Sequence, residues 1–270
     1  MIKVAGFSFN ALLTRLNAAW FSGEITTEQA TCLRYFSSVW LLYTRMLGRD
    51  VPVTWLAYVL ATTYHETAAT MRPIAEFGKG KGRPYGAPDH ETGQAYYGRG
   101  YVQLTWKVNY QAAQKTTLNL ATLTHDVPFV AQPDLALDPM YAAQIAINGM
   151  CNGWFTGKCL ANYLTTTHTD YVQARRIING MDKAELIAEY AEQAEMALRL
   201  ALGEAVPRAV VHYGDRGADV RELQLLLGVA PDGIAGADTI AALTAYQRTH
   251  ELADDGVCGL VTWAKLSESV

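Results

Sequence analysis

Glu66 has the most unusual position of any carboxylate in the sequence, because it follows a run of apolar residues with helical spacing. If residues 52–71 form a helix, Glu66 lies on the same stripe as Trp55 and Val59, since a helix advances about 100° per residue. A carboxylate on an apolar, core-facing stripe is uncommon because burial of a charge costs free energy. Two explanations remain open. Glu66 is either a structural carboxylate paired with an arginine or a general acid at the edge of a cleft.

General acid–base chemistry on a glycosidic bond needs a second carboxylate, and Glu76 and Glu91 follow Glu66 in the chain. In an unbroken helix Glu66 and Glu76 would lie about 15 Å apart by helical rise alone. The two carboxyl groups of an inverting glycosidase lie only about 6.5–9.5 Å apart. Pro73 resolves the difference, because it ends the helix near Arg72 and lets the chain fold back. Glu76 and Glu91 are therefore both candidates for the general base.

Alternating polar and apolar side chains follow a Gly-Arg-Gly run at residues 98–100. If residues 101–106 form a strand, one face carries a phenol, an amide and a hydroxyl, from Tyr101, Gln103 and Thr105. Such a face can hydrogen-bond a sugar or hold a water molecule. The alternative is an edge strand with one hydrated face.

Helical spacing of apolar residues dominates the remaining chain and predicts a mainly α fold. The interruption is a Gly- and Pro-rich segment at residues 76–100, which predicts a long loop of the kind that is usually functional. Helices are expected within residues 1–50, 52–72, 139–150, 170–178 and 182–202.

A second, smaller domain is expected at the C-terminal end. Residues 1–207 carry 17 basic and 17 acidic residues, whereas residues 208–270 carry 5 basic and 9 acidic residues and so account for the net charge of −4. The sequence DGxxGxxT occurs at residues 232–239 and again 23 residues later at 255–262, each time before a helical pattern. We therefore predict domains at residues 1–205 and 206–270, the second a small helical binding module.

Composition excludes several classes of protein. Half of the 270 residues are hydrophobic, which is enough for a packed core. The negative net charge argues against a nucleic-acid partner, and no apolar run is long enough for a membrane span. No secretory signal pattern is visible at the N-terminus. No metal is expected, because the HExxH pattern that begins at His65 has alanine at position 69.

The four cysteines carry no metal-binding spacing. Buried thiols are the expectation for them. A disulfide between Cys151 and Cys159, eight residues apart, is the less favoured alternative.

Several motifs occur together in the order typical of glycoside hydrolase family 19, which this sequence resembles. They are His65-Glu66-Thr67, YYGRGxxQLT at residues 96–105, Asn109-Tyr110 and IING at residues 177–180. The run GWFTGK at residues 153–158 is more similar to the phage and bacterial branch of the family than to the plant chitinases. The DGxxGxxT repeat resembles a three-helix peptidoglycan-binding module. The whole is similar to a modular phage endolysin.

The resemblance implies a mainly α fold, with a lysozyme-like catalytic domain of the family 19 chitinase type and a small three-helix peptidoglycan-binding domain. It assigns the general acid to Glu66, the general base to Glu76 and the water-positioning hydroxyl to Thr105. Substrate contacts are expected from Tyr97, Tyr101, Gln103, Asn109 and Asn179. The arginine that plant members place soon after IING is missing here, which leaves Arg72, Arg99 and Arg176 as candidates to support the base.

The implied function is that of an endolysin, a lysozyme or muramidase-type hydrolase that cleaves the β-1,4 bonds of peptidoglycan glycan strands with inversion and without a cofactor. We expect a monomer that stays in the host bacterial cytoplasm before lysis and then acts on the periplasm and cell wall. Two alternatives remain: a chitinase with the same mechanism, and a non-catalytic cell-wall-binding protein.

Overall fold

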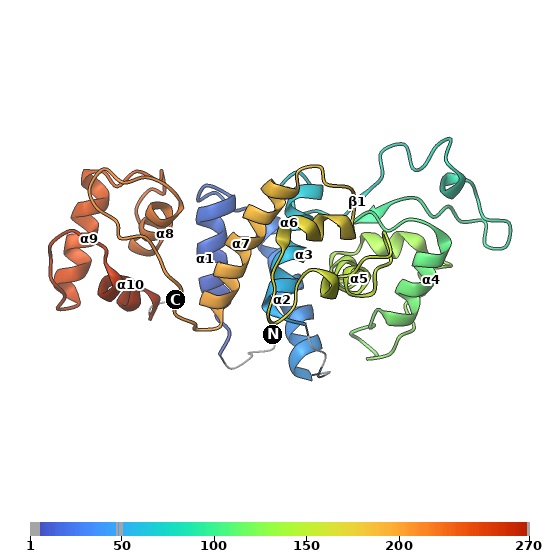
Figure 1. The fold of residues 1–270 in the computed structure, drawn as a ribbon, viewed down its shortest axis with the longest axis horizontal. Helices are drawn as coiled ribbons and strands as arrows, with labels where there is room; N and C mark the ends of the chain where they lie inside the picture. Colours follow the sequence, from blue (N-terminus) through green and yellow to red (C-terminus); the bar gives the residue numbers. More distant parts are fainter. Residues whose placement is uncertain (1–5, 47, 49–50, 269–270) are drawn as a thin grey trace. The chain divides into compact units, whose positions relative to one another are not determined.

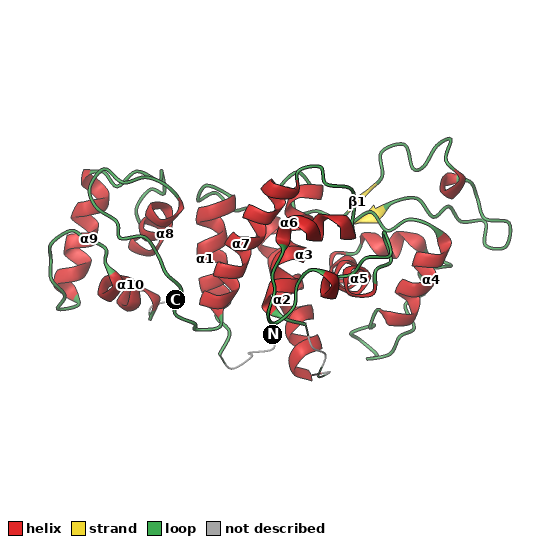
Figure 2. Cartoon of the chain, viewed as in Figure 1, coloured by secondary structure: helices red, strands yellow, loops and turns green. Residues whose placement is uncertain are grey.

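The computed structural model describes residues 6–46, 48 and 51–268 (Figure 1). Helices dominate the chain, and the named strands in the described residues form one small sheet (Figure 2). The expectation of a mainly α fold is confirmed. The chain divides into two compact units, one of Met1–Thr27 with Met196–Val270 and the other of Glu28–Glu195. Among the described residues, no helix combines the length and the hydropathy needed to cross a membrane.

The unit Glu28–Glu195 is built around two buried helices that contact each other, α3 (Val53–Glu66) and α5 (Pro139–Asn152). Residues 56–63 of α3 and 142–150 of α5 are buried without a break. Burial all round a helix is typical of a central position in the core. The other elements of this unit are α2 (Thr27–Leu41), which continues as a π-helical turn Leu42–Met46, α4 (Lys107–Thr116), α6 (Tyr171–Ala174), the first part of α7 (Ala184–Ala201), β1 (Ile74–Ala75), β2 (Arg99–Gly100), and 3-10 turns at Pro84–Gly86, Pro133–Leu137, Leu160–Asn162 and Arg175–Ile177.

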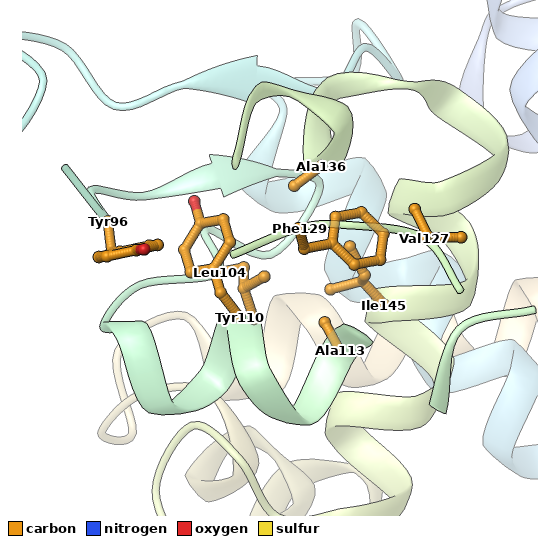
Figure 3. Packing of buried hydrophobic residues seen from close by; sticks show 8 residues of the cluster. All are labelled: Tyr96, Leu104, Tyr110, Ala113, Val127, Phe129, Ala136 and Ile145. Carbon is orange, nitrogen blue, oxygen red and sulfur yellow. The ribbon is translucent and has the colours of Figure 1, made fainter. Parts of the chain in front are cut away.

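A hydrophobic cluster fixes the segment around β2 to the helices that follow it (Figure 3). Its members come from the segments on either side of β2, from α4 and α5, and from the chain between them. They are Tyr96, Leu104, Tyr110, Ala113, Val127, Phe129, Ala136 and Ile145. The cluster holds the backbone of residues 96–104 against the core and so fixes the side chains that this segment presents.

The strand expected at residues 101–106 is wrong. β2 ends at Gly100, and the chain reverses so that Arg99 and Leu104 exchange two backbone hydrogen bonds of 3.1 and 2.8 Å. Gln103 and Trp106 have positive φ angles of 54° and 73°, which a strand does not allow. This tight turn breaks the alternation of faces, so Tyr101 points into the core while Trp106 is half exposed.

The unit that contains the C-terminus consists of α1 (Phe9–Trp20), the end of α7, and three further helices, α8 (Ala218–Leu227), α9 (Ala237–Thr249) and α10 (Leu260–Ser267). α1 packs against α8. Arg15 of α1 forms ion pairs with Asp219 and, at 2.7 Å, with Glu222. Arg15 and Glu222 are both buried, so this pairing is needed to compensate their charges.

Each copy of the DGxxGxxT repeat is closed by one buried glutamine from the preceding helix. Gln224 donates to Asp232 Oδ1 at 2.7 Å, the Ile234 carbonyl at 3.0 Å and Thr239 Oγ1 at 2.9 Å, and it accepts from the Gly233 amide at 2.8 Å. Gln247 makes the same four bonds 23 residues later, to Asp255, Val257, Thr262 and Gly256. The sequence repeat is therefore a structural repeat whose turns are held by a side-chain amide.

Replacement of Gln224 by alanine is expected to destabilise this repeat by about 2–4 kcal/mol, because several buried polar groups lose a partner at once. Hydrogen exchange of the Gly233 amide measures the loss directly. Thr249→Ala is a suitable control because the Thr249 hydroxyl is exposed and bonds only the Ala245 carbonyl of its own helix. Exchange of the Gly233 amide at the wild-type rate in Gln224→Ala would contradict this interpretation.

Cys32 and Cys258 are buried free thiols, as expected, whereas Cys151 and Cys159 are only partly buried, so the expectation of buried thiols is wrong for these two. Burial raises the pKa of Cys32 and Cys258 to about 12, so neither thiol is a nucleophile near neutral pH.

Candidate active site

Glu66 is the last residue of α3, and its side chain is 26% exposed. The helix ends here rather than near Arg72, because Thr67 closes it: the Thr67 hydroxyl donates to the Thr63 carbonyl at 2.7 Å and accepts from the Met71 amide at 3.0 Å. Ala68 and Ala69 then adopt positive φ angles of 48° and 64°, which turns the chain away from the helix axis. The last helical position therefore leaves the Glu66 carboxylate partly open to solvent.

Arg175 holds one oxygen of Glu66. Its Nη1 donates to Glu66 Oε1 at 2.6 Å, and its Nε donates to the Asp182 carbonyl at 3.0 Å. The arginine side chain is only 3% exposed, so its charge needs this partner. The arginine pairing that the structural explanation of Glu66 requires is therefore present. The carboxylate is also 26% exposed, as a general acid must be to reach a substrate, so the pairing and a catalytic role are compatible.

The three arginines considered from the sequence have other partners. Arg72 pairs with Glu28 at 3.3 Å on the surface, and Arg176 donates to the Gln173 side chain at 2.8 Å. Arg99 is buried and bonds Asp134 at 2.7 Å. Its guanidinium also bonds the carbonyls of residues 95 and 97 and the Tyr110 hydroxyl, which ties the hairpin to the helices behind it.

Glu76 follows β1 directly and is fixed by three hydrogen bonds. Its backbone amide donates to the Gly98 carbonyl at 2.7 Å, which extends the antiparallel pairing of β1 with β2. The Gly98 amide donates to Glu76 Oε2 at 3.1 Å, and the Tyr85 hydroxyl donates to Oε1 at 3.0 Å. The carboxylate thus lies at the edge of the small sheet, just before the loop of residues 77–98. Figure 1 shows the backbone of this loop between β1 and α4.

Glu91 has a different environment. Its side chain is 65% exposed and pairs with Lys107 at 2.6 Å, and Lys107 also pairs with Asp89 at 2.9 Å. The Lys107 ammonium lowers the pKa of Glu91 and, together with hydrogen bonds from Thr92, lowers that of Asp89 to about 2. These contacts tie the loop to the start of α4.

Three predicted residues are joined to one another by hydrogen bonds, and the first of them, Gln103, lies near Glu76. A Cβ atom at Gly98 would lie 2.8 Å from Gln103 Oε1 and 3.4 Å from Glu76 Cβ, so both side chains lie against Gly98. The Thr105 hydroxyl donates to the Gln103 carbonyl at 2.7 Å, and Asn109 Nδ2 donates to the Thr105 carbonyl at 2.8 Å. The Thr105 oxygen keeps lone pairs that can accept a hydrogen bond from a water molecule.

Tyr97, Tyr101 and Asn179 lie apart from this set. Tyr101 is 1% exposed and packs on Phe36 with ring centroids 5.1 Å apart, so its side chain belongs to the core rather than to a hydrated face. Tyr97 is buried beneath the Arg99 guanidinium, which lies 3.5 Å from the ring centroid. Asn179 is exposed, and its backbone amide donates to the Arg175 carbonyl at 3.1 Å, so it closes the turn that carries the Glu66 partner.

Sequence reasoning missed Arg175 and Tyr85. Arg175 lies just before IING, and its side chain reaches Glu66 across 109 positions of sequence, which no local pattern reveals. Tyr85 lies in the Gly- and Pro-rich segment, where periodicity gives no orientation for a side chain. In the described residues, no group of three or more His, Cys, Asp or Glu side chains is arranged to hold a metal ion.

Comparisons with known proteins give one match to a family model and several similar solved structures. Residues 216–266 match the sequence model of a family described as "Putative peptidoglycan binding domain". The chain is similar to the crystal structure of chitinase C from Streptomyces griseus HUT6037, with 20% identity and a TM-score of 0.44, over 77% of this chain and 99% of that one. It is also similar to the structure of a bacterial family 19 chitinase, with 19% identity and a TM-score of 0.32, over 76% of this chain and 91% of that one. The family match covers most of the segment from α8 to α10 that contains the glutamine-closed repeat.

Proposed function

We propose that this protein hydrolyses the β-1,4 glycosidic bonds of peptidoglycan glycan strands as a lysozyme-type endolysin. The observation that carries the proposal is the pair of carboxylates Glu66 and Glu76, which lie in one unit, are each partly exposed, and are each fixed by a separate partner. Glycosidases use two such carboxylates in different environments. The order of the family 19 motifs around them supports the same reaction.

In the proposed mechanism, Glu66 donates a proton to the glycosidic oxygen as the bond to the anomeric carbon breaks. Arg175 holds Oε1, so Oε2 is the oxygen that carries this proton. Glu76 removes one proton from a water molecule, and the second hydrogen atom of that water donates a hydrogen bond to Thr105 Oγ1. The water oxygen attacks the anomeric carbon from the opposite face. The configuration is inverted, and both carboxyl groups return to their starting states by exchange with solvent.

The match of residues 216–266 to a peptidoglycan-binding family supports peptidoglycan as the substrate. A domain that holds the enzyme on the cell wall raises the local concentration of glycan around the catalytic unit. Residues 216–266, which match the family model, contain both copies of the DGxxGxxT repeat, and a glutamine side chain closes each copy. We propose that the protein acts as a monomer, is held in the host cytoplasm until lysis, and then reaches the wall.

The test is the release of reducing ends from purified sacculi and from colloidal chitin under the same conditions. We expect steady release from sacculi and a rate at least about tenfold lower from chitin, because the module favours the peptidoglycan surface. Faster release from chitin would make the protein a chitinase. Binding to sacculi without release of reducing ends from either polymer would indicate a non-catalytic wall-binding protein.

A further inference from the structure

Tyr85 lies between Glu76 and Glu91, the two candidates for the general base. Its hydroxyl donates a hydrogen bond to the Glu76 side chain. The bond to Oε1 is 3.0 Å long, and the Gly98 amide binds the other oxygen at 3.1 Å. The hydrogen bond to Glu76 raises the pKa of Tyr85, so the phenol keeps its proton and acts as a donor throughout the neutral range. Both oxygens of the carboxylate therefore accept a hydrogen bond, one from a side chain of the loop and one from the backbone.

The backbone around Tyr85 is fixed by neighbouring segments. The Tyr85 carbonyl accepts from the Tyr96 amide at 3.0 Å, and the Tyr96 carbonyl accepts from the Trp106 amide at 2.9 Å. Tyr96 itself belongs to the buried cluster of Figure 3. Tyr85 is thus linked through two backbone bonds to the rigid part of the unit, although it lies in a long loop.

The ring of Tyr85 is fixed from two directions. The Trp106 ring meets it edge to face, with centroids 5.2 Å apart and an interplanar angle of 76°. Gly80 packs against the Tyr85 ring and against Gly86. A Cβ atom at Gly80 would be 2.9 Å from Tyr85 Cε2 and 2.8 Å from Gly86 Cα. A Cβ atom at Gly86 would be only 2.0 Å from the Gly80 carbonyl oxygen. The loop closes on itself at these two glycines, and that closure requires the absence of side chains.

We infer that Tyr85 is the positioning residue for the general base: its hydroxyl orients Glu76 toward the attacking water, and Trp106 with the Gly80–Gly86 closure holds the phenol in place. The loop of residues 77–98 then has a defined task, which is to deliver one hydroxyl to the carboxylate at its start. A hydrogen bond to a charged acceptor is strong enough that its loss lowers turnover by about tenfold or more. This inference rests on the proposed function, because it assigns Glu76 the role of base.

The test compares Tyr85→Phe with wild type on solubilised glycan strands. We expect kcat to fall about tenfold while KM stays within about twofold, because the phenol acts on the reacting water rather than on sugar binding. Tyr213→Phe, which alters an exposed tyrosine of the other unit, is the control for the substitution itself. Gly86→Ala is a second variant, since it displaces the loop closure, and it should lower kcat in the same direction.

The decisive comparison adds Tyr85→Phe to Glu76→Gln. If Tyr85 acts through Glu76, the double variant is no slower than Glu76→Gln alone, because the group to be positioned is already missing. An equal further loss in the double variant, or an unchanged kcat in Tyr85→Phe, overturns the inference while leaving the glycosidase intact. Wild-type protein that releases no reducing ends overturns the proposed function and this inference together.

Discussion

Replacement of Glu66 by glutamine is expected to lower kcat on peptidoglycan by about 10²–10⁴-fold, which is the usual contribution of a general acid. The amide has the same shape as the carboxyl group, and its oxygen can still accept the hydrogen bond from Arg175. It cannot transfer a proton to the leaving glycosidic oxygen. The measurement is the rate of reducing-end release per folded molecule, with the folded fraction taken from circular dichroism.

The same variant separates the two explanations that the sequence left open for Glu66. If the residue served only as the partner of the buried Arg175, its replacement would reduce the free energy of unfolding and leave turnover per folded molecule close to wild type. Thermal unfolding of Glu66→Gln therefore accompanies the rate measurement. Turnover of Glu66→Gln within about twofold of wild type would show that Glu66 has only a structural role.

Replacement of Glu76 by glutamine is expected to produce a loss of similar size, about 10²–10⁴-fold, because the amide cannot accept a proton from the attacking water. The fold should change little. The Gly98 amide can still donate to the side-chain oxygen, and the Tyr85 hydroxyl can still find an acceptor or solvent. Binding to peptidoglycan, measured by cosedimentation, should also be unchanged.

Glu91→Gln is the matched control for Glu76→Gln, since Glu76 directly precedes the loop of residues 77–98, Glu91 lies within it, and both changes remove one negative charge. Glu91 is exposed and pairs with Lys107, so its loss should leave activity within about twofold of wild type. A large loss in Glu91→Gln with normal activity in Glu76→Gln would transfer the role of base to Glu91.

The helices were predictable because their signals are local. The helix expected at residues 139–150 is observed as α5, and the structure adds its N-cap, Asp138, whose side chain accepts from the amides of residues 140 and 141. The DGxxGxxT repeat likewise predicted two equivalent turns before helices. Its closure by Gln224 and Gln247 was not foreseen, because a lone glutamine in a helix gives no sign of the turn that it reaches.

The parts that failed depend on particular hydrogen bonds that the pattern of residue types does not reveal. Residues 101–106 alternate like a strand, but Gly100 with a φ of 86° and the Arg99–Leu104 bonds impose a turn that buries Tyr101. α3 ends at Glu66 because the Thr67 side chain closes it, which outweighs the later Pro73. Glu66 could be predicted as a site residue because it lies on an apolar helical stripe. Its partner Arg175 could not, because it lies in a turn that only tertiary folding brings near Glu66.

One measurement tests the central claim most directly: mass spectrometry of the soluble fragments that the wild-type protein and Glu66→Gln release from purified peptidoglycan, before and after borohydride reduction. The account predicts new glycan ends that are free reducing sugars, with the yield from Glu66→Gln strongly reduced. A reducing N-acetylmuramic acid end would define a muramidase, and a reducing N-acetylglucosamine end a glucosaminidase. Fragments that carry only 1,6-anhydro ends, or fragments freed by cleavage of peptide stems without new reducing ends, would contradict hydrolysis by Glu66 and Glu76.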